Sequence, residues 1–417
     1  MSHYKPYPAY KDSGVEWIGR VPAHWEVLRL ANVGPLVKGN GGTKADDADD
    51  GIPCIRYGDL YTTYDFVIRK IKKFILPESM SNYARIQFGD LLLAASGETF
   101  EEIGKSAVNL DERQAVCGGD VIILRPERKI DPIFLAYAAG SVSAQAQKSL
   151  MGKGFTVIHV YGDSLRNLLI AAPPEREQEQ IGAAIERETA RIDVLIAKKT
   201  EFIDLLKGKI SALASQHPDS PEIKWVRLSH ICEVISRPVL QQAGSSYTKL
   251  GLFNKGRGIF KREDADAEDM GESDFFWVRS GDLILSGQFA WEGAVAMANE
   301  EHTGCVVSHR FPVVRGRKNE VLTEYLLAYF LTNHGDFVLN DCSRGSAGRN
   351  RPLNMNLLLG WKIPVPPMQV QSEVARLVQL ERRIGSLVTK NIDLLKKRRS
   401  ALITAAVTGQ IDLRESA

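Results

Sequence analysis

The sequence lacks the residue patterns on which most metal sites depend. Its five cysteines lie far apart and form no C-x-x-C pair: Cys54, Cys117, Cys232, Cys305 and Cys342. The eight histidines show no metal-ligand spacing either. Structural zinc sites need ligands at short, regular intervals, so we expect no metal-binding residues in this chain. We interpret the cysteines as reduced, mostly buried residues of a cytoplasmic protein.

Long apolar runs and a strong net charge are also missing. No stretch of about eighteen apolar residues occurs in the sequence, so it predicts no membrane-spanning helix. The start, Met1–Pro6, has no apolar run behind basic residues and does not predict a signal peptide. The net charge of +2 is almost neutral. Any nucleic-acid-binding face must therefore come from local clustering of basic residues.

Catalytic motifs are absent as well. Ser96–Ser106 has some letters of a phosphate-binding loop, but G-x-x-x-x-G-K-[ST] needs a glycine where Thr99 stands. Pro218–Lys224 has the letters of a metal-dependent nuclease motif, crowded into a proline-rich hinge. The sequence contains no Asn-Pro-Pro-Tyr or Asp-Pro-Pro-Tyr loop of an amino-methyltransferase and no G-x-G-x-x-G. We therefore expect no catalytic residues and predict that the chain alone is not an enzyme.

What the sequence does contain is a repeat with a period of about 190 residues. Two segments open on Pro-Pro and later carry Ile-Asp-Leu-Leu-Lys: Pro173–Lys207 and Pro366–Lys396. Proline is tolerated before or within the first helical turn, and apolar residues follow at steps of three, four and seven. Each segment predicts a helix of about forty residues, roughly 60 Å long. An apolar seam of that length needs a partner, so we expect the two helices to pair as a coiled-coil hairpin.

The two predicted helices differ by close to one turn. The repeat offset is 193 residues at the Pro-Pro pairs but 189 residues at the Ile-Asp-Leu-Leu-Lys motifs. The first helix therefore carries four extra residues in its first half. One turn adds length and nearly preserves the apolar face.

Globular segments alternate with the helices. Apolar runs next to glycine predict buried strands at Asp90–Leu93 and at its repeat Asp282–Leu285. Helical spacing follows at Leu135–Tyr137, which we match to Leu327–Tyr329. The predicted fold class is α+β: two similar globular α/β domains joined by two long antiparallel coiled-coil helices, in a pseudo-two-fold repeat. The expected boundaries are 1–172 for the first domain, 173–216 for the central helix, 217–365 for the second domain and 366–417 for the distal helix.

Candidate DNA contacts lie in loops of the globular segments, where basic, amide and aromatic residues stand next to glycine. Lys and Arg neutralise phosphates, while Arg, Asn and Gln can read base edges. The candidates in the first domain are Lys38, Asn40, Lys44, Arg56, Tyr57, Lys153 and Thr156. The candidates in the second are Gln241, Tyr247, Lys249, Lys255, Arg257, Arg344, Ser346, Arg349, Asn350 and Arg351. The alternative for any one loop is a solvated turn, but three arginines within Ser343–Arg351 favour an anion partner.

Both ends of the chain resemble one protein family. The opening, Tyr10–Gly19 followed by Val21–Val27, and the ending, Leu402–Asp412, resemble the termini of the specificity (S) subunits of type I restriction-modification systems. With the repeat between them, the resemblance covers essentially the whole chain. It implies that the two globular segments are target recognition domains. Each would read one half of a bipartite site in double-stranded DNA.

The resemblance also implies partners. The two helices would pack antiparallel, set the spacing between half-sites and dock methyltransferase (modification) subunits, expected in two copies. Motor-nuclease (restriction) subunits would join the complex. S-adenosylmethionine, ATP and magnesium are then expected on those partner subunits, and no cofactor on this chain. Tyr10–Gly19 is expected near the distal helix, which makes the layout pseudo-circular.

Two other functional classes stay open at the level of the sequence. One is a nuclease or methyltransferase with an unrecognised motif. The other is a stand-alone DNA-binding or coiled-coil scaffold protein without a modification partner. Neighbouring genes would separate these classes, because a specificity subunit is encoded beside a methyltransferase and a large helicase-nuclease.

Overall fold

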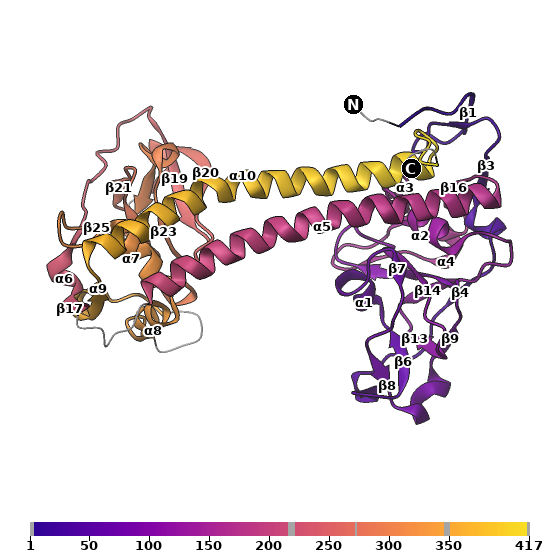
Figure 1. The fold of residues 1–417 in the computed structure, drawn as a ribbon, viewed down its shortest axis with the longest axis horizontal. Helices are drawn as coiled ribbons and strands as arrows, with labels where there is room; N and C mark the ends of the chain where they lie inside the picture. The colour runs from indigo at the N-terminus through magenta and orange to yellow at the C-terminus, as the bar shows by residue number, and fades with distance from the viewer. Residues whose placement is uncertain (1–3, 216–221, 272, 346–350, 415–417) are drawn as a thin grey trace. The chain divides into compact units, whose positions relative to one another are not determined.

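The computed structural model describes residues 4–215, 222–271, 273–345 and 351–414. The chain falls into two compact units (Figure 1). Unit 1 comprises residues 1–197 and 392–417, and unit 2 comprises residues 198–391. Two long helices, α5 (Glu175–Ala214) and α10 (Met368–Val407), contribute residues to both units. The division into four segments predicted from the sequence stays a prediction.

Unit 1 is built mainly from short strands. These are β1 Tyr10–Asp12, β2 Arg20–Pro22, β3 Glu26–Arg29, β4 Leu36–Lys38, β5 Asp47–Ala48, β6 Ile52–Ile55, β7 Val67–Ile68, β8 Phe74–Ile75, β9 Ala84–Ile86, β10 Leu91–Ala94, β11 Ser96–Gly97, β12 Ser106–Asn109, β13 Ala115–Cys117, β14 Val121–Leu124, β15 Ile158–His159 and β16 Leu169–Ala172. Its shorter helices are α1 Tyr57–Thr62, α2 Pro132–Gly140, α3 Val142–Met151 and α4 Gly162–Leu165.

Two five-stranded sheets organise unit 1, in the orders β4-β14-β10-β12-β7 and β5-β8-β6-β13-β9. Strand β10 is buried on both faces. Leu91 and Leu93 enter the core that also holds Phe134 of α2. Leu92 and Ala94 enter a second core. Successive side chains of a strand point to opposite faces, which explains why this strand is a continuous apolar run.

Unit 2 has the same mixture of elements. Its strands are β17 Lys224–Arg227, β18 Cys232–Val234, β19 Ser246–Leu252, β20 Ile259–Asp266, β21 Phe275–Trp277, β22 Leu283–Leu285, β23 Val295–Met297, β24 Val306–Ser308, β25 Val313–Gly316 and β26 Lys362–Val365. Its shorter helices are α6 Leu228–Ile231, α7 Thr323–Phe330, α8 Asn333–Asp341 and α9 Met355–Gly360. The main sheets have the orders β18-β25-β22-β23 and β20-β19-β24-β21.

The central strand of each unit carries the same buried ion pair. Asp90, directly before β10, pairs with Arg125 at 2.7 Å. Asp282, directly before β22, pairs with Arg315 at 2.5 Å and with Arg237 at 2.7 Å. Burial alone would raise the pKa of Asp282, but hydrogen bonds from these two arginines and from a backbone amide lower it. The matching strand and arginine motifs of the two repeats therefore mark one duplicated scaffold.

A buried glutamine at the start of each long helix forms a second duplicated feature. The Gln178 side chain accepts a hydrogen bond from the backbone N–H of Asp131, at 2.9 Å, and donates to Pro173 O. Gln371 accepts one from Leu322 N–H, also at 2.9 Å, and donates to Pro366 O. Asp131 and Leu322 are the N-cap residues of α2 and α7. Each long helix is thus hydrogen-bonded to the N-cap residue of a helix in its own globular part, α2 for α5 and α7 for α10.

The positions of the helix N-caps correct one residue correspondence between the two repeats that was predicted from the sequence. The N-caps of α2 and α7, Asp131 and Leu322, are 191 residues apart, as are those of α3 and α8, Ser141 and Thr332. The match of Leu135–Tyr137 with Leu327–Tyr329 uses an offset of 192 and is therefore wrong by one residue. Helix α7 has no side-chain cap, so its start gave no sequence signal.

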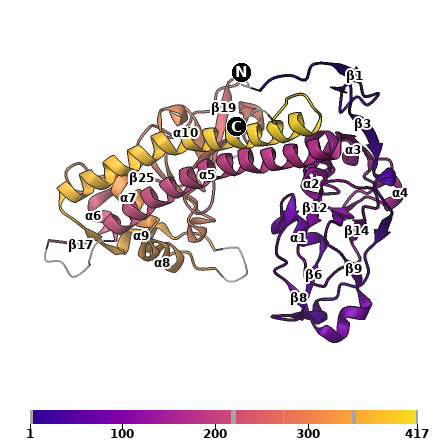
Figure 2. The same cartoon turned by 45° about the vertical axis from the view of Figure 1, so that its right-hand side comes forward.

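The long helices pack antiparallel, as Figures 1 and 2 show. In unit 2, Lys207 of α5 lies 3.8 Å from Glu381, and Lys209 lies 3.9 Å from Glu373, so the partner number falls as the α5 number rises. In unit 1, Arg399 of α10 pairs with Asp193 of α5 at 3.0 Å. Each helix has 40 residues, so the predicted length of about forty is confirmed. The four extra residues in the first half of α5 do not make it the longer helix, because α10 continues further after its Ile-Asp-Leu-Leu-Lys motif.

The first and last described segments of the chain meet in unit 1. Asp412 N–H donates to Lys5 O at 2.9 Å, and Gln410 donates to Arg20 O. Gly409, two residues after the end of α10, has a φ of +72°. Its close contact with Pro22 leaves no room for a Cβ atom. The expected position of the opening segment near the distal helix, and so the pseudo-circular layout, is confirmed.

The described residues contain neither a membrane-spanning helix nor a metal-binding cluster. In residues 4–215, 222–271, 273–345 and 351–414, no helix combines the length and the apolar character that crossing a membrane requires. Within the same ranges, no three His, Cys, Asp or Glu side chains gather where a metal ion could bind. All five cysteines are free and buried.

Candidate nucleic-acid interface

Unit 2 has a concave surface whose lining combines cations, amides and phenyl rings. It encloses 460 Å³ between β19, β20 and the turns that follow β22 and β24. The cations are Lys249, Arg262 and Arg310. The amides are Asn254 and Gln288, and the rings are Phe260, Phe275, Phe289 and Phe311. Cations suit phosphates, amides suit base edges, and rings suit the faces of bases.

A second hollow of 670 Å³ continues this surface. It shares Gln288 and Arg310 with the first hollow and has Arg344 at its edge. Asn354 and Asn356, on either side of the start of α9, add two further amides. We call the two hollows together the unit 2 groove. It joins two of the loops that the sequence had offered separately, through Lys249 and Arg344.

The basic side chains of the unit 2 groove are largely free to meet an anion. Arg262 and Arg310 are exposed and form no ion pair with any residue the structure describes. The Arg262 guanidinium lies 5.9 Å from the centre of the Phe260 ring, which holds it at the surface. Arg344 pairs with Asp341 at 2.8 Å but stays exposed. An exposed pair of this kind contributes only about 0–1 kcal/mol, so a phosphate can displace it.

The other predicted residues of unit 2 have different surroundings. Arg351 donates to the backbone oxygens of Ser343 and Asn340, and its guanidinium lies 4.9 Å from the centre of the Trp291 ring. These contacts therefore tie Arg351 to the end of α8. Arg257 likewise donates to Asn254 O. Ser346, Arg349 and Asn350 lie outside the described residues.

Tyr247 and Lys249, which were predicted from the sequence to belong to a loop, lie on strand β19. Tyr247 is 6% exposed, and its hydroxyl accepts a hydrogen bond from Gln242 N–H at 3.1 Å. The ring packs on Trp277, so Tyr247 supports the preceding loop from the inside. Gln241 is exposed on that loop. Lys255 is exposed too, but its backbone is held by Glu292 O, outside the unit 2 groove.

In unit 1 the predicted residues fall into two groups. The loop from Lys38 to Lys44 runs along Gly118–Gly119, with backbone hydrogen bonds from Gly39 to Val121 O and from Gly119 to Gly41 O. Arg56 joins this loop through Thr43 O, at 2.8 Å. Its pair with Asp47, at 2.5 Å, raises the pKa of Arg56 and keeps it charged. Lys38, Asn40, Lys44 and Tyr57 are exposed.

The second group of unit 1 is the loop of Lys153 and Thr156. Lys153 and His159 exchange two backbone hydrogen bonds, of 2.9 and 2.8 Å, and so close its base. The segment after it pairs with β11, where Gly97 is opposite Ile158. In unit 2 the corresponding contact is Leu353 N–H to Gly287 O, at 2.8 Å. A Ser-Gly pair after the central strand therefore contacts the segment that follows a polar loop in each unit.

Sequence reasoning missed most of the unit 2 groove, including Arg262, Gln288 and Arg310. A signal for Gln288 was present, because Ser286–Gly287 repeats Ser96–Gly97 and each pair precedes a polar residue. Nothing local marks Arg262 or Arg310, since strand pairing brings them together from β20 and from the turn after β24.

Comparison with known proteins decides the family of the first repeat. Residues 22–203 match the family model of the type I restriction modification DNA specificity domain. These residues form a specificity domain of that family. This match and the relatives below confirm the family resemblance that the sequence predicts.

The relatives of the specificity domain extend the similarity along the chain. The type I restriction enzyme StySPI specificity subunit of Salmonella potsdam is 21% identical over 410 residues, 89% of this chain and 87% of that protein. The MjaVIII specificity subunit of Methanocaldococcus jannaschii is 21% identical over 430 residues, 95% of each. A solved structure from a study of complex assembly and conformational transition of the type I R-M system shares the fold. Its TM-score is 0.61 at 20% identity, over 93% of this chain and 98% of that one.

Proposed function

We propose that this protein is the sequence-specific DNA-recognition subunit of a type I restriction-modification complex. The observation that carries the proposal is the duplicated scaffold with different loops. Both units keep the same buried ion pair and the same glutamine joint, yet their polar loops differ in length and residues. Two readers of one design with different surfaces suit a bipartite site whose halves differ in sequence.

Recognition is assigned to the globular parts of the two units. In unit 2, the exposed cations of the unit 2 groove would neutralise phosphates and position the duplex, and the exposed Gln288 would contact base edges. The side chains of Asn254 and Asn354 are already hydrogen-bonded, to Glu292 and to the N-terminus of α9. In unit 1, Lys38, Lys44 and Lys153 would serve the same purpose from the two loops. The chain's near-neutral charge is no obstacle, because phosphate contacts depend on local clusters.

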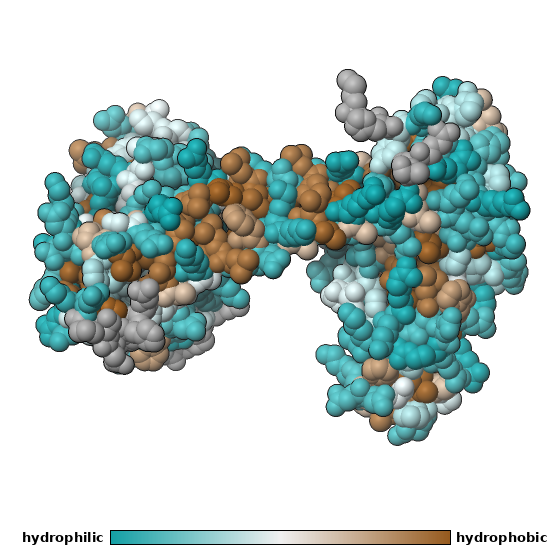
Figure 3. Space-filling model, in the orientation of Figure 1, coloured by the Kyte–Doolittle hydropathy of each residue, from teal (hydrophilic) through white to brown (hydrophobic). Residues whose placement is uncertain are grey.

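The long helices are the proposed docking surface for methyltransferase subunits. Several large apolar side chains of α5 and α10 are exposed: Val194, Leu195, Phe202, Leu205, Leu380, Leu387 and Leu394. Figure 3 shows hydrophobic atoms gathered along the two helices. Exposed apolar surface of this extent is typical of protein interfaces. The two similar ends of the helix pair fit two methyltransferase copies, joined by motor-nuclease subunits.

The partner subunits would then catalyse the reactions on DNA. The complex would act in the cytoplasm. S-adenosylmethionine would bind the methyltransferases, and ATP with magnesium would bind the motor-nuclease. This chain would position the methyltransferases over the bases that its two units recognise. The alternating arrangement of units and helices would set the number of base pairs between half-sites.

The proposal is tested by mixing subunits. The purified chain, the methyltransferase encoded beside it, and their mixture are each incubated with DNA and labelled S-adenosylmethionine. Methyl transfer is expected from the mixture only. Transfer by the chain alone would contradict the proposal, because it would show a catalytic site in the chain itself.

A further inference from the structure

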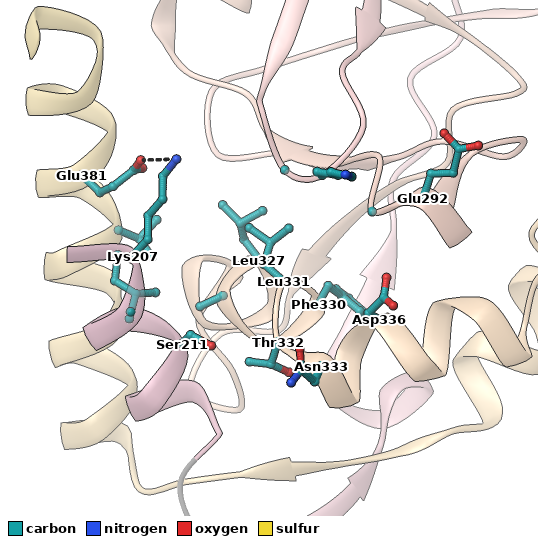
Figure 4. Close-up of a pocket in the computed structure, with 17 residues that line it drawn as sticks. Lys207, Ser211, Glu292, Leu327, Phe330, Leu331, Thr332, Asn333, Asp336 and Glu381 are labelled. Carbon is teal, nitrogen blue, oxygen red and sulfur yellow. Dashed lines mark ion pairs between the residues drawn. The ribbon is translucent and has the colours of Figure 1, made fainter. Parts of the chain in front are cut away.

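Unit 2 contains a cavity where the helix pair meets the α7–α8 junction (Figure 4). It encloses 520 Å³ and is lined only by residues of unit 2. We call it the joint cavity. One wall consists of Lys207, Ile210 and Ser211 of α5 with Val378 and Glu381 of α10. It is separate from the unit 2 groove, which has a different lining apart from Glu292.

The joint cavity has an apolar floor and charged edges. Leu327, Phe330 and Leu331 form the floor. Three carboxylates lie around it, those of Glu292, Asp336 and Glu381, together with two lysines, Lys207 and Lys255. Glu381 and Lys207 are 3.8 Å apart, a loose pair at the edge. An apolar floor with an excess of carboxylates suits a long cationic or amphipathic side chain.

The same place in unit 1 is filled by the chain itself. The rings of Phe66 and Tyr137 lie 4.7 Å apart, centre to centre, and Phe66 covers Gly140. The Arg399 guanidinium lies 5.5 Å from the centre of the Phe66 ring. Arg399 also pairs with Asp65 and Asp193, at 3.0 Å each. A stack of two aromatic rings and a guanidinium therefore closes the unit 1 site.

The repeat shows which substitutions open the site in unit 2. The Ser-Ala-Leu motifs that begin at Ser211 and Ser400 place Ile210 opposite Arg399. The cap offset of 191 residues places Ala328 opposite Tyr137. Near Leu331, the neighbouring loop brings Gly256 where unit 1 has Phe66. Arg399, Tyr137 and Phe66 are thus replaced by smaller residues, while Leu331 stands where unit 1 has Gly140.

We propose that the joint cavity receives an aromatic side chain and an adjacent arginine from a methyltransferase subunit. This inference rests on the proposed function. The occupant has the chemistry of the side chains that close the unit 1 site, and the three carboxylates of the joint cavity complement its positive charge. Because the unit 1 site is closed, this contact forms once per chain, and the two methyltransferases are held unequally.

A variant whose joint cavity is filled by its own side chains, called the plugged chain, tests the proposal directly. The double substitution Ala328→Tyr with Ile210→Arg rebuilds two of the unit 1 side chains in unit 2. The chain is titrated with its methyltransferase, and the populations with one and two bound copies are measured by native mass spectrometry. The plugged chain is expected to lose at least ten-fold in affinity for one copy and to keep the other unchanged. Leu240→Tyr with Val234→Arg adds the same side-chain types at exposed positions of unit 2 outside the joint cavity and serves as the control.

A charge reversal covers the case in which the plugged chain does not fold. Glu381→Lys with Asp336→Lys adds no bulk to the floor and is expected to weaken the same single copy. Wild-type affinity for both copies in the plugged chain, or in the charge-reversed chain, overturns the proposal. A wild-type chain that binds no methyltransferase instead overturns the proposed function itself, so the two failures are distinguishable.

Discussion

Lys148 of α3 is fully buried, and its charge should cost unit 1 stability. Its ammonium donates one hydrogen bond, to Gly104 O at 2.7 Å. Burial first, and the nearby Lys105 second, lower the pKa of Lys148 to about 7. The position 191 residues later is Leu339, which is buried and apolar. The second unit therefore shows that the scaffold accepts an uncharged side chain here.

The free-energy cost of burying the Lys148 charge falls as the pH rises. The unfolded chain holds the proton with the usual lysine pKa, so between pH 7 and 10 it binds more protons than the folded chain. Stability then rises with pH across that range, and the penalty is complete below pH 7. The linkage relation with these two pKa values gives a penalty of about 4 kcal/mol at pH 7 and about 2 kcal/mol at pH 9.

Lys148→Met removes the charge and keeps the length of the side chain. We expect unit 1 to melt at a higher temperature, with a gain at pH 7 about twice the gain at pH 9. Differential scanning calorimetry at both pH values measures this, with Lys153→Met as the control because Lys153 is exposed. An equal gain at both pH values would refute the depressed pKa. A loss at both would show that the bond to Gly104 outweighs the burial penalty.

Three further predictions concern recognition, spacing and the scaffold. Arg344→Ala should weaken DNA binding by about 1–3 kcal/mol if the contact is to a base. Arg351→Ala should first lower the stability of unit 2, because Arg351 is hydrogen-bonded to the end of α8. Anisotropy titrations measure the first effect and melting curves the second. Deleting Thr189–Ile192 removes about 6 Å of helix and turns it by only about 40°, so methylated sites should have half-sites one or two base pairs closer with unchanged sequences; sequencing of methylated DNA shows whether the half-sites change instead. Asp282→Asn should cost unit 2 about 3–5 kcal/mol, since it leaves Arg237 and Arg315 without their buried carboxylate, and wild-type melting would refute this. In the wild type the lowered pKa of Asp282 predicts that this stability is present above about pH 4 and is lost as the pH falls further.

Long-range regularity made the helices and the repeat predictable. Forty residues of apolar spacing after Pro-Pro define α5 and α10, and the structure confirms both. The buried strands at Asp90 and Asp282 were equally clear, because an apolar run after Gly-Asp is a local signal. The match at α7 failed by one residue because Leu322 offers no side-chain cap.

The surfaces were less predictable, for a physical reason. Arg262 and Arg310 are distant in the sequence and meet only because β19 pairs with both β20 and β24. Tyr247 shows the reverse case. It lies in a polar, glycine-rich stretch of sequence that looks exposed, but its side chain is buried against Trp277. The joint cavity is visible only when the two folded units are compared position by position.

The sites methylated by the complete complex test the central claim most directly. Genomic DNA from a host that carries the wild-type chain, and from one that carries Arg262→Ala with Arg310→Ala, is sequenced with detection of methylated bases. We predict a bipartite consensus for the wild type, and for the variant a relaxed or lost preference in one half-site with the other half-site and the spacing unchanged. A consensus in one continuous piece, or a variant that changes both half-sites, would contradict the assignment of one half-site to each unit.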